Sequence, residues 1–265
     1  MSGPVTEADA PADADSNHHI ATDGVEVLDS RETRVGNLAV RRALPKRGHR
    51  TVGAWCFADH AGPVSVTESE KVDIGPHPHM GLQTVTWLLA GELVHRDSLG
   101  SEQEIRPGQL NLMTAGNGVA HAEETNGGYR GEFHGIQLWV AQPEATRHGE
   151  PAFEHHGELP KIELDGGVAT VFVGELEEAA SLARRDTDHV GVELALRPGR
   201  TVVPVRPDYE HALIVLEGSL DLGATHVEPG HLAYLGMGRD EVAVGTTDKP
   251  VTPGPSASRA GLVSC

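Results

Sequence analysis

The sequence has few cysteines, few basic residues and no long apolar run. Its two cysteines, Cys56 and Cys265, are far apart in the chain, so we expect neither a disulfide framework nor a zinc pair. Lys and Arg number 21 against 39 Asp and Glu, a formal net charge of −18. That charge repels nucleic-acid phosphates and anionic lipid headgroups, so we expect no direct nucleic-acid partner.

Membrane and export signals are also missing from the sequence. No stretch approaches the roughly 18 to 20 apolar residues that a membrane-spanning helix needs. The start of the chain has no basic segment followed by an apolar one. We therefore expect no membrane partner and a cytoplasmic location.

What the sequence does have is turn residues, with 32 Gly and 17 Pro among its 265 residues. Short segments of β-branched and apolar residues recur between these turns, a pattern that predicts an all-β fold of antiparallel strands. The expected strands are 83–89, 109–113, 135–140, 168–173, 211–216 and 231–235. Helical spacing occurs only at 175–184, where Leu176, Ala179 and Ala183 would share one face, and we expect a short surface helix there.

The two ends of the chain differ in composition from its middle. Residues 1–34 combine small, acidic and Pro residues without apolar periodicity, which predicts a disordered acidic tail. His18 and His19 lie in it, and we expect them to be solvated. Residues 246–265 are rich in Pro, Ser and Gly, so we expect a flexible tail that holds no site, within which Ala260–Val263 could dock weakly.

The middle of the chain resembles itself. Leu88–Leu93 (LLAGEL) and Val215–Leu220 (VLEGSL) are both apolar segments closed by a Gly turn. Each is followed by a Pro-Gly turn, at Pro107 and at Pro229. Such a repeat predicts two similar β-domains in tandem.

The domain boundaries follow from composition. We expect an N-terminal domain over 35–141 and a C-terminal domain over 162–245. Residues 142–161 between them are polar and contain Pro, as expected of a linker. His155 and His156 lie in this linker, and we expect both to be solvated.

Two pairs of metal-binding residue types stand in the first domain. His77 and His79 flank a proline, and a His-x-His on a strand projects both imidazoles to one face. Taken alone, such a pair is more often two packed or solvated histidines, so it needs partners. His121 and Glu123 follow a Gly-rich turn at the same spacing, and two such pairs on neighbouring strands can surround one ion. Three imidazoles and one carboxylate suit Fe(II), Mn, Ni, Cu or Zn.

Short motifs in a fixed order extend this pattern over the first domain. They are HPHMG at 77–81, TVTWLLAG at 84–91, PG at 107–108, MTAGNG at 113–118 and HAE at 121–123, with DHAGP at 59–63 upstream and HGIQLWV at 134–140 downstream. The order resembles the pirin family of bicupins, and the resemblance covers roughly residues 35 to 245. It implies two tandem cupin domains, which are jelly-roll-like β-barrels. It also implies one divalent metal, iron above all, in the N-terminal barrel, with His77, His79, His121 and Glu123 as its ligands.

The same resemblance implies a function. Some pirins act as quercetin 2,3-dioxygenases, which open a flavonol ring with O2 and release carbon monoxide, so a flavonol-like molecule and O2 are the expected partners. Glu123 would then also be catalytic and relay the proton of the flavonol hydroxyl. The alternative is a non-enzymatic metal- or redox-responsive regulator that binds a transcription factor or a metabolic enzyme. A structural bicupin with an accidental metal site is disfavoured by the coincidence of four ligands.

Several further polar residues lie near these motifs. Gln83 stands where many cupins have a metal-binding Glu, and it either hydrogen-bonds a ligand at the metal or is only an inward polar residue of its strand. We expect Glu124 to point away into solvent and His60 to cap a turn. His134 could contact the site or make a structural hydrogen bond, whereas His95 has no evident partner.

The second domain lacks the ligand pattern. Its positions equivalent to the four expected ligands are Pro204, Arg206, Ala243 and Gly245, so we expect a metal-free C-terminal cupin domain. The tryptophans Trp87 and Trp139 lie in apolar segments, where they would fill the core or form an aromatic wall for a flat polyphenol.

Overall fold

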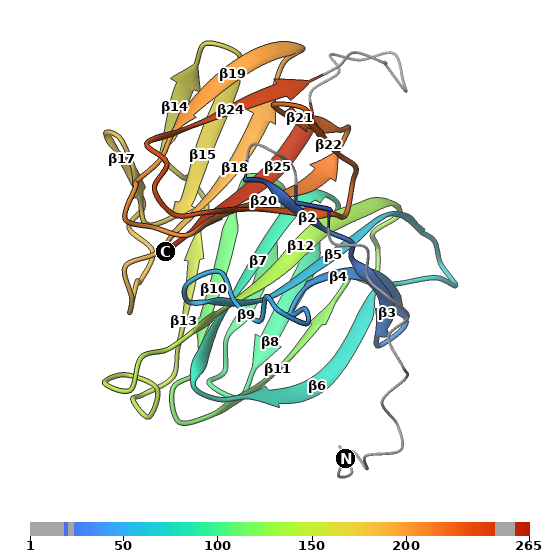
Figure 1. Ribbon diagram of the computed structural model, residues 1–265. Helices are drawn as coiled ribbons and strands as arrows, with labels where there is room; N and C mark the ends of the chain where they lie inside the picture. The colour runs from blue at the N-terminus through green and yellow to red at the C-terminus, as the bar shows by residue number, and fades with distance from the viewer. Residues whose placement is uncertain (1–18, 21–23, 247–257) are drawn as a thin grey trace.

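The computed structural model describes residues 19–20, 24–246 and 258–265, which fold into two stacked β-halves (Figure 1). Within these residues the regular secondary structure is β-strand throughout. The expected all-β fold is therefore confirmed. No helix in the described part of the chain has the length and apolar content that a membrane span requires.

The N-terminal half consists of a large and a small sheet. The large sheet has the order β13-β10-β7-β12-β5-β4-β3, with bounds β3 (Arg31–Val35), β4 (Leu38–Leu44), β5 (Trp55–Val66), β7 (Leu82–Ala90), β10 (Leu110–Thr114), β12 (Gly131–Ala141) and β13 (Ala152–His156). The small sheet has the order β6-β11-β8-β9, with bounds β6 (Asp73–His79), β8 (Leu93–Asp97), β9 (Glu102–Ile105) and β11 (Val119–Glu124). Leu88 from the large sheet and Leu93 from the small sheet belong to one buried apolar cluster, so the two sheets face each other.

The C-terminal half repeats this arrangement. Its large sheet has the order β1-β2-β23-β20-β25-β18-β15-β14, with bounds β1 (His19–Ile20), β2 (Glu26–Leu28), β14 (Lys161–Leu164), β15 (Gly167–Val173), β18 (Val190–Leu196), β20 (His211–Glu217), β23 (Leu232–Gly236) and β25 (Ser258–Ser264). Its small sheet has the order β19-β24-β21-β22, with bounds β19 (Gly199–Pro204), β21 (Leu220–Leu222), β22 (Thr225–Val227) and β24 (Glu241–Thr246). The small sheets of both halves share one connectivity, as a tandem repeat predicts.

Both segments that were expected to be tails contain β-strands. β25 pairs with β18 on one side and with β20 on the other, so the prediction of a flexible tail to the end of the chain is wrong for residues 258–264. The apolar run Ala260–Val263, expected only to dock weakly, is buried there within a full strand. At the other end, β2 pairs with β23 and β3 pairs with β4, so the prediction of disorder up to residue 34 is wrong for these two strands. Most of the predicted acidic tail, including His18, lies outside the described residues.

Two internal predictions are also wrong. The expected helix at 175–184 is instead a small hairpin of β16 (Glu175–Leu176) and β17 (Ala179–Ala180). Glu177 takes a positive φ of 49° at its turn, which a helix excludes. The expected linker contains β13, which extends the large sheet through β10. His155 is accordingly only partly exposed, and its Nδ1 lies 2.8 Å from the Asn111 side-chain oxygen.

The large sheets of the two halves share an apolar interface. Trp87 of β7 stacks on Phe172 of β15, with ring centroids 5.4 Å apart, and both belong to one buried cluster that spans the halves. Side chains alternate along a strand, so Trp87 faces the C-terminal half whereas its neighbours Thr86 and Leu88 line the interior of the N-terminal half. The interior of the N-terminal half is therefore enclosed by β7, β12 and the small sheet.

Candidate metal centre

The three expected histidine ligands converge on one point between β6 and β11. These strands are antiparallel neighbours, and His121 is the direct cross-strand partner of His77. Their ring centroids are 4.5 Å apart, and that of His79 lies 5.0 Å from His121. One ligand atom from each of the three rings lies within 4.8 Å of the others. This spacing allows one ion to contact all three rings.

Glu123 lies beside this cluster because it follows His121 on the same face of β11. The pairing of β11 with β6 shifts register between His121 and Glu123. Glu123 is only 4% exposed and lines the same cavity as the three histidines. The hydroxyl of Thr86 donates to its Oε1 over 2.8 Å, while burial raises the pKa of its carboxyl group. A buried carboxyl group of this kind is either protonated or paired with a cation, and a metal ion would supply that cation.

The nitrogens of the cluster fit a metal. The Nε2 atoms of His79 and His121 are buried and have no hydrogen-bond partner, a condition that costs about 1–3 kcal/mol per group unless something binds there. The ring of His77 donates from Nδ1 to the Gly75 carbonyl over 2.9 Å, so its Nε2 also keeps a lone pair. Burial, followed by the charge of His77, lowers the pKa of His79 to about 4 and that of His121 to about 2. Both rings are thus neutral, as metal binding requires.

A cavity of about 240 Å³ adjoins the cluster and is lined mainly by apolar side chains. Its wall contains Trp139, which stacks on its cross-strand partner Phe57 with centroids 3.8 Å apart and ring planes 12° apart. The guanidinium of Arg42 lies 4.5 Å above Phe57 and makes two 2.7 Å hydrogen bonds to Asp59. The aromatic wall that the sequence suggests for Trp139 therefore exists, whereas Trp87 is a core residue.

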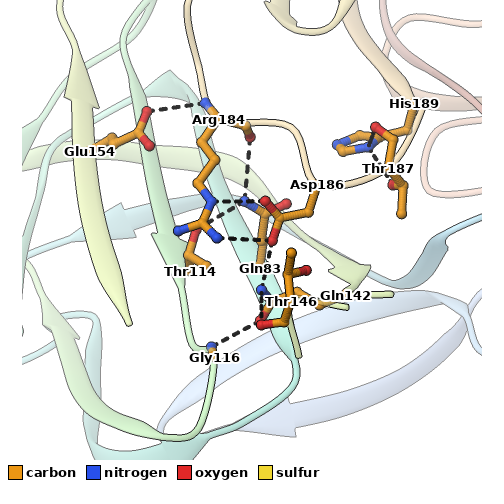
Figure 2. A network of polar contacts seen from close by, with 10 residues as sticks. All are labelled: Gln83, Thr114, Gly116, Gln142, Thr146, Glu154, Arg184, Asp186, Thr187 and His189. Carbon is orange, nitrogen blue, oxygen red and sulfur yellow. Dashed lines mark hydrogen bonds and ion pairs between the residues drawn. The ribbon is translucent and has the colours of Figure 1, made fainter. Parts of the chain in front are cut away.

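Gln83 lies away from the cluster. Its side chain donates to the Thr114 hydroxyl over 2.9 Å and to the Arg184 carbonyl over 3.3 Å. Figure 2 shows it in a polar network that also contains Asp186, which accepts hydrogen bonds from Arg184 and Gln142. The interpretation of Gln83 as a group near the metal is wrong, because it shares the strand face of Trp87 and not that of Thr86.

The remaining polar residues that the sequence analysis considered lie outside the cavity and make contacts with other side chains. Nε2 of His60 lies 2.7 Å from Nε2 of His134 in a buried pair, so His60 does more than cap a turn, and neither ring lines the cavity. Glu124 is exposed, as expected, and forms an ion pair with Arg96. The strands of the second half carry no equivalent cluster among the described residues. There, Val202 of β19 pairs with Ala243 of β24.

His95 is the functional candidate that the sequence analysis missed. It is 2% exposed, and its Nδ1 lies 3.3 Å from Nδ1 of His121. With His121 and Glu123 it forms a second group of atoms within 4.8 Å of one another. Its Nε2 lies 3.0 Å from Oδ2 of Asp97. The signal that could have found it is the His-x-Asp spacing, the same alternation that revealed His-x-His.

Known proteins are similar to this chain in sequence and in fold. Residues 37–140 match the family described as Pirin. A pirin-like protein of Caulobacter vibrioides is 35% identical over 223 residues, which are 82% of this chain and 77% of that relative. A Pseudomonas aeruginosa protein provisionally named a quercetin 2,3-dioxygenase is 45% identical over 206 residues. That match spans 77% of this chain but only 65% of the relative, just under two thirds of its length.

A solved structure agrees with these relatives. The crystal structure of a quercetin 2,3-dioxygenase from Acinetobacter baumannii superposes with a TM-score of 0.84 at 37% sequence identity. The superposition covers 91% of this chain and 78% of that one. Sequence similarity over most of its length and a shared two-part β-fold thus lead to one conclusion: the chain belongs to the pirin family.

Proposed function

We propose that this protein is a metal-dependent flavonol dioxygenase of the quercetin 2,3-dioxygenase type. In this proposal His77, His79, His121 and Glu123 hold one divalent metal, with iron(II) as the metal expected from the family. The observation that carries it is the group of buried, unpartnered imidazole nitrogens at the end of an apolar cavity. The names of two relatives at 45% and 37% identity support the substrate.

The donor set alone leaves the metal open. Neutral imidazoles and a carboxylate also suit Mn, Ni, Cu and Zn, and cells select among these ions by availability as well as by affinity. The metal would supply Lewis-acid stabilisation of the flavonol 3-oxygen anion and a centre for reaction with O2, from which the ring-opened product and carbon monoxide leave.

The chain's own residues would bind and orient the flavonol. Its flat ring system fits against the indole of Trp139, which is held in place by the stacked ring of Phe57. Aliphatic side chains such as Val40 and Leu88 cover other parts of the cavity and exclude water from it. A flat, largely apolar ligand gains most from such a lining.

Glu123 is the proposed acceptor of the substrate's hydroxyl proton. The hydroxyl of Thr86 donates to Oε1, and the carboxylate keeps further lone pairs for the metal and for the proton. A carboxylate can accept that proton, whereas the amide of a glutamine cannot. Replacement by Gln should therefore lower turnover, and full turnover of a metal-loaded E123Q variant would remove this role.

The test is carbon monoxide release from quercetin in air by protein reconstituted with Fe(II). The variant His77→Ala/His121→Ala serves as the blank, and the metal content of both proteins is measured by mass spectrometry. We expect about one metal and steady CO release in the wild type, and neither in the variant. Wild-type protein that holds the metal and releases no CO would favour the non-enzymatic regulator, whereas stoichiometric metal in the variant would overturn the ligand assignment.

A further inference from the structure

A buried chain of hydrogen bonds runs from the candidate ligand His121 to a carboxylate behind it. Nδ1 of His121 lies 3.3 Å from Nδ1 of His95, and Nε2 of His95 lies 3.0 Å from Oδ2 of Asp97. The side chains of His95 and Asp97 are 2% and 0% exposed. The sequence places His95 and Asp97 on one face of β8, directly beside His121 and Glu123 of β11.

The direction of these hydrogen bonds follows from the turn after β8. The backbone N–H groups of Leu99 and Ser101 both donate to Oδ1 of Asp97, each over 2.9 Å. Such bonds favour the ionised carboxylate, which can only accept, so Nε2–H of His95 must donate to Oδ2. A neutral imidazole carries one proton, so Nδ1 of His95 accepts the Nδ1–H of His121.

This direction leaves Nε2 of His121 with its lone pair, and that atom is one of the two buried imidazole nitrogens of the candidate centre that have no hydrogen-bond partner. The orientation of the His95 ring is also restricted by packing, because Phe153 of β13 stacks on it with centroids 4.3 Å apart and planes 17° apart. Since both nitrogens of His95 are engaged, this residue is disposed to orient a ligand and not to be one.

We propose that Asp97 and His95 are positioning residues, which fix the tautomer and ring orientation of His121 and so raise the metal affinity of the centre. The inference rests on the metal centre of the proposed function. His77 is oriented by a main-chain carbonyl, at Gly75, whereas His121 depends on two side chains that substitution can alter. Loss of such an outer hydrogen bond typically weakens metal binding 10–100-fold.

The sharpest variant is Asp97→Asn. The asparagine oxygen can still accept from Leu99 and Ser101, but its NH2 group then faces His95 and donates to it. That reversal moves the His95 proton to Nδ1 and the His121 proton to Nε2, where it blocks the metal. An equivalent Asp-to-Asn change leaves the geometry of a serine protease triad intact but imposes the wrong histidine tautomer. Asp73→Asn, an exposed position on β6, is the matched control for charge.

The first measurement is Zn(II) affinity by competition with a chromogenic chelator. We expect D97N and His95→Leu to bind 10–100-fold more weakly than wild type, D73N to bind within about twofold, and His121→Ala to bind most weakly. Wild-type affinity in D97N would overturn the inference. A loss in H95L as complete as in H121A, with a changed Co(II) absorption spectrum, would make His95 a ligand and overturn it as well.

The second measurement needs no metal. Long-range 1H–15N NMR of metal-free protein with labelled histidine reports which ring nitrogen carries the proton. We expect His121 as the Nδ1–H tautomer in the wild type and as the Nε2–H tautomer in D97N, and an unchanged tautomer would contradict the inference. Wild-type protein that fails to bind Zn(II) or Co(II) at all would instead refute the metal centre of the proposed function, while this tautomer test would still report on the hydrogen-bonded chain.

Discussion

The imidazole of His79 packs edge-on against the indole of Trp139, with ring centroids 4.9 Å apart and planes at 73°. Trp139 also stacks on Phe57, and both rings line the cavity. One aromatic side chain thus contacts a candidate metal ligand and provides the wall for a flat substrate. A change at Trp139 can therefore separate substrate binding from metal binding, because the nitrogens of His79 are not altered.

Trp139→Leu should weaken quercetin binding about tenfold while the metal content stays at one per chain. The loss corresponds to roughly 1.4 kcal/mol, within the range of an aromatic stacking contact plus lost area. Quercetin affinity is measured by fluorescence quenching of the metal-loaded, oxygen-free protein. Trp139→Phe keeps a flat wall and should bind within about threefold of wild type, and equal affinity in the Leu variant would refute the wall.

Thr86→Val should destabilise the protein by about 1–3 kcal/mol, because Oε1 of the buried Glu123 loses the hydroxyl that donates to it. Valine has nearly the same shape, so the effect reports the hydrogen bond and not a cavity. Guanidinium unfolding of metal-free protein measures it. Thr86→Ser retains the hydroxyl and should recover most of the loss. If Thr86→Val were as stable as the wild type, Glu123 would have no need of this donor.

The sequence could reveal those site residues that stand two positions apart on one strand, because their side chains point to the same face. His77 with His79, and His121 with Glu123, are visible because two residues of one site share a strand face. The sequence analysis considered Gln83 and not Thr86, which lies on the opposite face of the same strand. The sequence of a strand does not say which of its two faces turns toward the site. Phe57 was missed because its role depends on its pairing with Trp139 across strands, a contact between residues far apart in the chain.

The end of the chain illustrates the same limit. Composition predicts a tail from residue 246, yet β25 is inserted between β18 and β20. Nothing local specifies that insertion, because the strand gains its hydrogen bonds from paired residues that lie at least 42 positions away in sequence (259 − 217). Phe153 was likewise assigned to a linker, although its ring is needed to hold His95.

Leu262→Ala tests whether β25 is a core strand. Leu262 is 1% exposed in the apolar core of the C-terminal half, so its truncation should cost about 2–5 kcal/mol. Leu182→Ala is the matched control, because Leu182 is 90% exposed and its loss should change stability by no more than about 0.5 kcal/mol. Guanidinium unfolding compares the two variants. If Leu262→Ala were as stable as Leu182→Ala, β25 would not be a core strand.

The buried pair of His60 and His134 predicts acid sensitivity. Burial, followed by the charge of Arg41, lowers the pKa of His60 to about 2 and that of His134 to about 4, whereas an unfolded histidine titrates near about 6.5. Below that pH the unfolded chain binds more protons than the folded one, so the free energy of unfolding falls as the pH drops from about 6.5 toward 4. For His134 alone, the loss between about pH 7 and pH 5 amounts to about 2 kcal/mol.

His134→Gln removes this titration, so the variant should lose about 2 kcal/mol less than the wild type between those two pH values, even if it is less stable at pH 7. Urea unfolding at both pH values, with chelator present so that no metal contributes, gives the difference. His148→Gln is the control, since the side chain of His148 is 65% exposed and its removal should leave the wild-type pH dependence in place. If His134→Gln kept the full wild-type slope, the pair would not be held neutral by burial, and the acid sensitivity would have to come from other groups.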